Sequence, residues 1–233
     1  MKAEIISTGN ELVTGAVADT NTAAIAGLLN GYGIGVSRST TVGDDMDALS
    51  ELFSEASLRA ALVLVTGGLG PTVDDLTARA ASRAANVPLE LDRDALDSVK
   101  RFFENRQIQM PEENEKQAML PSSAMMIDNS HGTAPGFSMT INHARFYFLP
   151  GVPSEMRHMM ERSILEDITS RFACRKRPQA KVTLFGVPES KADAMLKGFD
   201  ERFPGIGLGF RAAFPVIEVK LSCTGDAHER ELA

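Results

Sequence analysis

One short segment limits the possible folds of this chain more than any other. Residues 60–65 are apolar at every position, and Thr66 and a glycine-rich turn follow them directly. A strand that is apolar on both faces is typical of the centre of a parallel sheet, where helices cover both sides. The segment therefore predicts an α/β protein and argues against an all-helical or an all-β fold.

The pattern around this segment repeats the same unit. Strand-like runs at 2–7 and 34–42 come before it, and helical patterns follow all three runs at 22–33, 47–58 and 74–85. Successive β-then-α units require right-handed crossovers, which place the strands parallel and the helices on both faces. A helix at 93–106, strands at 136–141 and 145–149 and a long helix at 153–172 complete the predicted fold.

A second, smaller unit is predicted after a basic stretch with a proline at 175–178. The pattern beyond it indicates a strand at 181–187, a helix at 190–202 and strands near 207–210 and 216–223. These elements suit a small α+β unit. We therefore predict two domains, at residues 1–174 and 179–233.

Composition narrows the possible partners. The chain has 233 residues and a formal net charge of −7, which argues against nonspecific binding to nucleic acid or to anionic membranes. No uncharged apolar run approaches the roughly 20 residues needed to span a bilayer, and no leader pattern follows Met1. We expect a cytoplasmic protein with two reduced thiols, Cys174 and Cys223. The histidines show no zinc-binding spacing.

Glycines and acidic or amide residues follow each of the first three predicted strands. They are Gly9, Asn10 and Glu11; then Gly43, Asp44 and Asp45; then the glycine turn with Asp74 and Asp75. In an open parallel sheet, ligands bind beyond the carboxyl ends of the strands. These acids are therefore expected to lie along one edge of the sheet.

The glycine turn indicates a phosphate site. Gly67, Gly68 and Gly70 allow positive φ and close backbone approach, and a following helix presents N–H groups to an anion. Glycine also serves strand-to-helix turns for geometry alone, so this alternative stays open. Thr72 and Asp75 likewise match the spacing of a helix capping box.

The doubled acids point to a metal. Capping explains one acid at each helix start, as for Asp45, but not the pairs at 44–45 and 74–75, because adjacent like charges repel. A divalent ion such as Mg²⁺, held by one or two carboxylates and ligand phosphates, would remove that cost. The candidate metal ligands are Glu11, Asp44, Asp74 and Asp75.

Two later segments are expected to close the pocket. Residues 131–137 are too rich in glycine and proline for regular structure, and residues 148–156 lead from a strand into a helix start that could hold a second anion. Lys116 could supply positive charge to a phosphate. A solvated surface lysine is the alternative.

These residues carry a resemblance to a known family. The segments 9–21, 42–45, 66–77, 113–121, 133–137 and 149–156 resemble, in order and spacing, the amino-terminal domain of the competence/damage-inducible CinA proteins. CinA belongs to the molybdopterin-binding, MoaB/Mog-like superfamily. The resemblance covers residues 1–172 and implies a Rossmann-like three-layer α/β/α fold with a mostly parallel sheet. It also implies self-association, as a dimer or trimer. More weakly, the part after residue 180 resembles a KH-like unit.

The resemblance implies two activities. In the wider superfamily, acids that match Asp44 and Asp75 serve cofactor binding or adenylyl transfer to molybdopterin. CinA-type domains are associated with metal-dependent hydrolysis of nucleotide pyrophosphates such as ADP-ribose. Asn10 stands where the family often has aspartate, which would weaken metal binding if that carboxylate is a ligand. CinA proteins usually carry a further nicotinamide-mononucleotide deamidase domain, and we expect no such activity from these residues.

The leading hypothesis is therefore an Mg²⁺-, Mn²⁺- or Co²⁺-dependent pyrophosphatase with Asp44, Asp75 and Lys116 as catalytic residues. The residues expected to bind substrate are Gly9, Asn10, Glu11, Asn21, Gly67, Gly68, Gly70, Thr72, Pro135, Gly136, Gly151, Pro153 and Glu155. Molybdopterin handling and nucleotide binding without turnover are the alternatives.

Overall fold

The computed structural model describes residues 2–223, which form two compact units. The first unit comprises the chain up to Asn30 together with Ile34–Ala173. The second comprises Gly31–Gly33 and the described residues from Cys174 onward. The predicted second domain extends to residue 233, so its last ten positions lie outside the described residues. No helix in the described part of the chain is long and apolar enough to cross a membrane.

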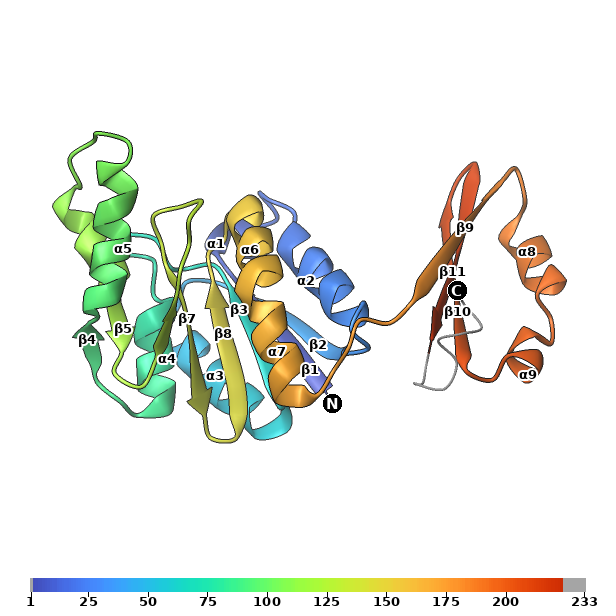
Figure 1. Cartoon of the computed structure of the whole chain (residues 1–233), viewed down its shortest axis with the longest axis horizontal. Helices are drawn as coiled ribbons and strands as arrows, with labels where there is room; N and C mark the ends of the chain where they lie inside the picture. The colour runs from blue at the N-terminus through green and yellow to red at the C-terminus, as the bar shows by residue number, and fades with distance from the viewer. Residues whose placement is uncertain (1, 224–233) are drawn as a thin grey trace. The chain divides into compact units, whose positions relative to one another are not determined.

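A six-stranded sheet forms the centre of the first unit, in the order β2-β1-β3-β8-β7-β6 (Figure 1). Its strands are β1 (Lys2–Thr8), β2 (Gly35–Val42), β3 (Leu62–Thr66), β6 (Met125–Ile127), β7 (Gly136–Ile141) and β8 (Ala144–Leu149). β2, β1, β3 and β8 pair in parallel, whereas β7 and β6 add antiparallel strands at one edge. The predicted α/β fold with a mostly parallel sheet is confirmed.

Helices cover both faces of this sheet. They are α2 (Thr20–Asn30), α3 (Met46–Arg59), α4 (Thr77–Ala85), α6 (Pro153–Met159) and α7 (Leu165–Phe172). α3 and α4 pack together on one face, and α2 packs beside α6 on the other. Figure 1 shows α6 and α7 crossing that second face. The apolar strand β3 is buried at all five positions, as a strand covered on both sides must be.

Aromatic side chains fill the core on the α3 face. Phe53 from α3 meets Phe148 edge to face, with ring centroids 5.5 Å apart, and Phe137 stacks on Phe148 at 4.3 Å. All three rings are fully buried. Because each ring adds large buried area and a specific contact geometry, this cluster ties α3 to β7 and β8.

An inserted segment extends the first unit beyond α4. It contains the short antiparallel pair β4 (Leu89–Leu91) and β5 (Met119–Pro121), with α5 (Arg93–Glu104) and a 3₁₀ segment η1 (Glu112–Ala118) between them. A four-residue helix, α1 (Asn10–Val13), follows β1. η1 carries Lys116 and Gln117 toward the glycine turn, so this insertion supplies part of the site described below.

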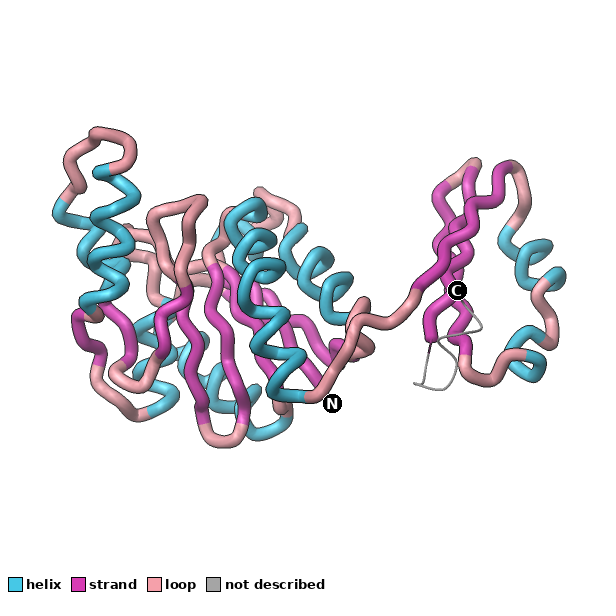
Figure 2. Tube along the Cα trace, in the orientation of Figure 1, coloured by secondary structure: helices cyan, strands magenta, loops and turns pink. Residues whose placement is uncertain are grey.

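The second unit is a three-stranded antiparallel sheet with two short helices (Figure 2). Its elements are β9 (Gln179–Phe185), α8 (Glu189–Met195), α9 (Phe199–Arg202), β10 (Ile206–Ala213) and β11 (Val216–Cys223). One helix was predicted at 190–202, but Gly198 at φ 81° divides it, because that left-handed conformation ends a right-handed helix.

Two predicted helices of the first unit also differ in detail. The helix expected from residue 74 begins at Thr77, because residues 72–75 form a separate turn closed by their own side chains. The long helix at 153–172 is continuous but contains a π-helical turn, η2 (Met160–Ile164), between α6 and α7.

The aromatic cluster leads to a stability prediction. Phe53→Ala should lower the free energy of unfolding of the first unit by about 3–5 kcal/mol, because a fully buried ring would leave a cavity. Leu58→Ala, at a position of α3 that is 67% exposed, is the control and should change it little. Urea denaturation followed by circular dichroism measures both. Equal losses in the two variants would contradict this account of the core.

Candidate functional site

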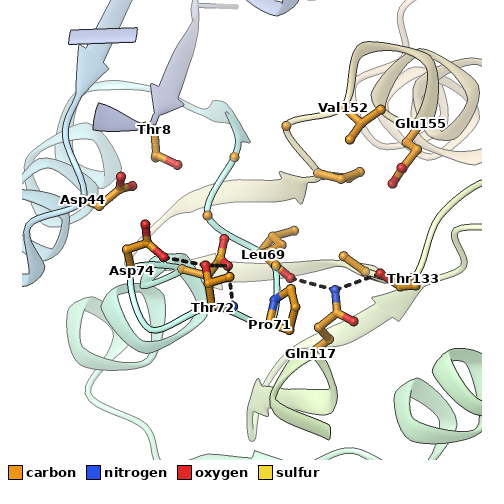
Figure 3. A pocket seen from close by; sticks show the side chains of 18 of the residues that line it. Thr8, Asp44, Leu69, Pro71, Thr72, Asp74, Gln117, Thr133, Val152 and Glu155 are labelled. Carbon is orange, nitrogen blue, oxygen red and sulfur yellow. Dashed lines mark hydrogen bonds between the residues drawn. The ribbon is translucent and has the colours of Figure 1, made fainter. Parts of the chain in front are cut away.

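A cleft of about 350 Å³ lies where the four parallel strands end. Thr8 ends β1, Asp44 follows β2, Gly67 follows β3 and Pro150 follows β8, and all four line the cleft. Figure 3 shows Asp44 and Asp74 on one side and Glu155 on the other. The cleft therefore occupies the edge at which open α/β sheets bind ligands.

The glycine turn forms one wall, and two of its glycines have left-handed backbone conformations. Gly67 has φ 108° and Gly68 has φ 65°. A Cβ at Gly67 would lie 2.3 Å from the carbonyl oxygen of Thr8, and one at Gly68 would lie 2.2 Å from Thr77 Oγ1. Thr77 Oγ1 donates to the Gly67 carbonyl at 2.9 Å, which holds the turn against the start of α4. Only glycine fits these two positions.

Gly70 is required for a different reason. A Cβ there would lie 2.5 Å from Asp75 Oδ2. Asp75 accepts hydrogen bonds from the Thr72 N–H at 2.9 Å and from Thr72 Oγ1 at 2.6 Å, so its carboxylate folds back over the glycine. The absence of a side chain at Gly70 therefore allows the carboxylate to lie against the backbone of the turn.

This geometry corrects two predictions about the turn. Thr72 and Asp75 do not form a helix capping box, because α4 begins later, at Thr77. Leu76 and Thr77, at the start of α4, also do not line the cleft. The helix start predicted to face an anion therefore lies outside it.

The two acids after β2 have different partners. Asp45 is the N-cap of α3 and accepts from the N–H groups of Asp47 and Ala48, as the capping interpretation predicts. Asp44 instead lines the cleft and accepts from the Asn10 N–H at 2.9 Å. Asn10 Oδ1 accepts the Asp44 N–H in return, at 3.1 Å. The asparagine thus locks the two loops together.

The cleft is strongly acidic. Five carboxylate residues line it: Glu11, Asp44, Asp74, Asp75 and Glu155. No lysine, arginine or histidine within residues 2–223 lines it with them. Burial, and then the negative charges of Glu11, Asp74 and Asp75, raise the pKa of the Asp44 carboxyl above its ordinary value. The hydroxyl of Thr72 donates to Asp74 and lowers the pKa of that exposed carboxyl.

The carboxylates of the cleft could bind a cation only if a bound phosphate ligand also coordinated it. No three histidine, cysteine, aspartate or glutamate side chains of the described chain lie close enough to hold a metal ion alone. Mg²⁺ commonly binds through one or two carboxylates and completes its shell with water and substrate phosphates. A bound cation would relieve the repulsion among the carboxylates, which adds to burial in raising the pKa of Asp44.

The wall after β8 is held by a buried asparagine. Asn21 Nδ2 donates to Thr66 Oγ1 at 2.9 Å and to the Gly151 carbonyl at 2.8 Å. Thr66 Oγ1 donates to the Pro150 carbonyl at 2.9 Å. These bonds connect α2, β3 and the loop before α6, so they set the distance between the glycine turn and Gly151.

The remaining wall comes from the inserted segment and the loop before β7. Gln117 Nε2 donates to Thr133 Oγ1 at 3.1 Å and lies 3.5 Å from the Leu69 carbonyl. Asn129 Nδ2 donates to Glu155 Oε2 at 2.7 Å and to the Ala134 carbonyl at 2.8 Å. These bonds fasten residues 129–134 between η1 and α6.

Eleven residues predicted for the site line the cleft: Gly9, Glu11, Asp44, Gly67, Gly68, Gly70, Thr72, Asp74, Asp75, Gly151 and Glu155. Six do not: Asn10, Asn21, Lys116, Pro135, Gly136 and Pro153. Asn10 and Asn21 connect loops, as described above. Pro153 is the first residue of α6.

The other three are set back for separate reasons. Lys116 donates from Nζ to the Thr72 carbonyl and borders a smaller cavity behind the glycine turn, together with Pro135. Gly136 is buried at the start of β7, where a Cβ would lie 2.6 Å from the Phe148 carbonyl oxygen. Lys116 therefore acts on the cleft only through its charge, which contributes to the lowered pKa of Asp74.

Eight residues that were not named as site residues also line the cleft: Thr8, Leu69, Pro71, Gln117, Thr133, Ala134, Pro150 and Val152. Four of them, Thr133, Ala134, Pro150 and Val152, lie in the two segments expected to close the pocket. Most lie within or beside the motifs. Gln117 follows Lys116 directly, and its uncharged amide gives no signal in the sequence comparable with the charge of the lysine.

Comparison with known proteins agrees with this architecture. Residues 4–170 match the family model described as a probable molybdopterin binding domain. The CinA-like protein of Desulfosudis oleivorans is 45% identical over 224 residues, 95% of this chain and 54% of its own length. The crystal structure of CinA from Thermoplasma acidophilum, described as of unknown function, is 34% identical, with a TM-score of 0.67 over 72% of this chain and 99% of that one. The chain belongs to the CinA-like family.

Other relatives extend the comparison. The CinA-like protein of Escherichia coli strain SMS-3-5 is 40% identical over 232 residues, 99% of this chain and 57% of that protein. The chain thus spans little more than half the length of these CinA-like relatives. The molybdopterin biosynthesis enzyme MoaB of Thermus thermophilus has a TM-score of 0.50 at 18% identity, over 74% of this chain and 94% of that one. MoaB therefore shares the fold of the CinA-like first unit.

The raised pKa of Asp44 makes stability depend on pH. A carboxyl whose pKa is raised by folding favours the folded state when protonated, so its ionisation destabilises the fold as pH rises through that pKa. Asp44→Asn stays neutral and keeps an acceptor for the Asn10 N–H. The free energy of unfolding of this variant, minus that of wild type, should therefore be higher at pH 7 than at pH 3. Urea denaturation at both pH values measures this, and a difference that does not change with pH would show that burial and the neighbouring acids do not raise the pKa of Asp44.

Proposed function

We propose that the first unit catalyses metal-dependent hydrolysis of a nucleotide pyrophosphate such as ADP-ribose. The observation that supports this most is the charge of the cleft: five carboxylates face a glycine-rich wall, with no basic side chain among the described lining residues. A pyrophosphate would be repelled from such a cleft unless a cation accompanied it. A cleft built for a metal–phosphate pair would need this combination of acids and open backbone.

The proposed substrate contacts come from the backbone of the glycine turn and of the neighbouring Gly151. The backbone N–H groups of Gly68 and Gly70 donate no hydrogen bond to any described residue, so both can donate to phosphate oxygens. Gly151 lies beside the glycine turn, because a Cβ built there would be in van der Waals contact with Gly67 Cα, at 3.5 Å. The two phosphates would lie against this backbone surface, and Gln117 and Thr133 would contact the remainder of the ligand.

The carboxylates would bind the metal. Asp44 and Asp75 are the proposed principal ligands, with Glu11 or Asp74 contributing. A divalent cation such as Mg²⁺, Mn²⁺ or Co²⁺ supplies charge neutralisation and acidifies the attacking water. The Asn10 N–H orients Asp44, and Thr72 orients Asp75. Lys116, behind the Thr72 carbonyl, offsets negative charge from outside the cleft.

Activity tests this proposal. Purified protein incubated with ADP-ribose and each of the three metals should release AMP. Asp75→Asn should lower kcat about a hundredfold or more, because a carboxylate proposed to bind the metal is lost while an acceptor for Thr72 remains. Chromatographic detection of AMP measures both.

Asp94→Asn is the matched control, because Asp94 is an exposed aspartate of α5 outside the cleft. It should keep wild-type activity. No AMP with any metal would exclude the pyrophosphatase, and a fully active Asp75→Asn variant would exclude the role given to that residue.

Molybdopterin handling is the second candidate. It is supported by the match of residues 4–170 to a probable molybdopterin binding domain. Retention of a pterin in a pull-down, or complementation of a strain lacking molybdenum-cofactor synthesis, would favour it over the hydrolase.

A third candidate is a nucleotide-binding module without turnover. The same cleft would then bind its ligand but release no product. Tight ADP-ribose binding by calorimetry, together with undetectable AMP release, would favour this alternative.

A further inference from the structure

A second groove, of about 270 Å³, lies on the sheet face that carries α7 and shares no residue with the acidic cleft. Its floor is the antiparallel edge of the sheet. Met125 of β6 pairs with Ser138 of β7, and Ser138 pairs with Tyr147 of β8, so the three side chains emerge on one face. Its wall is the π-helical turn together with α7.

The groove has more positive than negative charge. Arg145, Arg162 and Arg171 line it, against two carboxylates, Asp128 and Asp167. Asp128 lies toward α5, where it accepts from the Ser98 hydroxyl at 3.1 Å. One guanidinium is therefore in excess within this set of lining residues.

Asp167 is shared among several donors. It accepts the Tyr147 hydroxyl at 2.5 Å and Arg171 Nε at 2.8 Å, while the guanidinium of Arg145 is 3.7 Å away. Burial would raise the pKa of Asp167, but these donors hold it below its ordinary value. Burial, and then the contact with Asp167, raises the pKa of Tyr147 to about 12. At neutral pH the carboxyl is therefore ionised and the tyrosine is the donor.

The arginines are incompletely neutralised. Arg145 donates to Ser138 Oγ at 2.6 Å, but its Nε is buried and has no hydrogen-bond partner among residues 2–223. Arg162 is exposed and forms no ion pair with any residue that the structure describes. Both facts indicate guanidinium groups whose hydrogen-bonding capacity or charge is not fully satisfied by the described residues.

The π-helical turn is an independent observation at the same place. It interrupts the continuous helix from α6 to α7, and three of its five residues, Arg162, Ser163 and Ile164, line the groove. π-Turns are rare, since they widen the helix and weaken its hydrogen bonding, and they occur frequently at functional sites. Here the extra residue changes the direction of the following side chains relative to the sheet.

An apolar strip completes the groove. Met125 is 61% exposed, and Ile127, two residues along the strand and therefore on the same face, is half-buried. Met126 points to the opposite face, where it packs against the core. A ligand that filled the groove would therefore place a charged group near the arginines and an apolar part on the strip. The planar guanidinium matches both carboxylate and phosphate groups in geometry.

We propose that this groove binds a small organic anion, with its carboxylate or phosphate group on Arg162 and its apolar part on Met125. The site is separate from the proposed hydrolase cleft and does not depend on that activity.

Nuclear magnetic resonance of the full chain with ¹³C-methyl methionine tests the site. Benzoate and phenyl phosphate are the two organic probes, and inorganic phosphate is the probe without an apolar part. The Met125 methyl signal should shift with increasing probe, whereas that of Met195, an exposed residue of the second unit, should not. Response to benzoate, to phenyl phosphate or to both supports the site and identifies the preferred charged group. Inorganic phosphate should bind at least about tenfold more weakly than the better organic probe, because it cannot cover the apolar strip.

Matched variants locate the charge. Arg162→Gln should weaken binding about tenfold or more, the loss expected for one charge-assisted hydrogen bond. Arg157→Gln removes an exposed arginine of α6 that lines neither cavity and should leave binding unchanged. Asp75→Asn should also leave it unchanged, which separates this site from the acidic cleft.

Several results would overturn the proposal. These are no Met125 shift with either organic probe, equal weakening by the two arginine variants, or inorganic phosphate binding as tightly as the better organic probe. A Met125 signal that depends on protein concentration but not on any probe would instead identify the groove as an interface between copies of the chain.

Discussion

Parallel pairing of β2, β1, β3 and β8 is the constraint on which the site depends. Parallel strands end at the same edge, so segments far apart in the chain deliver Asp44, Thr8, Gly67 and Pro150 to one cleft. The aromatic core beneath β8 and the buried Asn21 bonds hold that edge in place. A change that loosened the sheet would therefore also separate the walls of the cleft.

The acidic cleft and the basic groove of the first unit differ in charge because different parts of the sheet form them. The parallel edge gathers loops that carry acids and glycines, and no described basic side chain lines it. The antiparallel edge exposes a strand face beside a helix, and its arginines outnumber its acids. A chain with a net charge of −7 thus contains a local basic groove, because charge is distributed by the fold and not by the average composition.

Much of the fold and part of the site could be predicted from local patterns. The apolar run at 60–65 requires cover on both faces, and the repeated β-then-α order leaves parallel pairing as the consistent arrangement. Gly67 and Gly68 mark positive φ, which a local pattern can indicate. The capping box at 72–75 was wrong, because the same residue spacing also closes a turn that precedes the helix.

The sequence alone established the fold class and the acids and glycines at the strand ends, because periodicity and turn chemistry are local properties. Only the tertiary structure decided which of these side chains face the cleft. Lys116 lies behind a carbonyl while Gln117 faces inward, although the two are neighbours in the chain. The basic groove also required the structure, since Arg145, Arg162 and Arg171 share no motif and meet only through the register of β6, β7 and β8 and the π-turn. Such contacts depend on long-range packing, which no local pattern specifies.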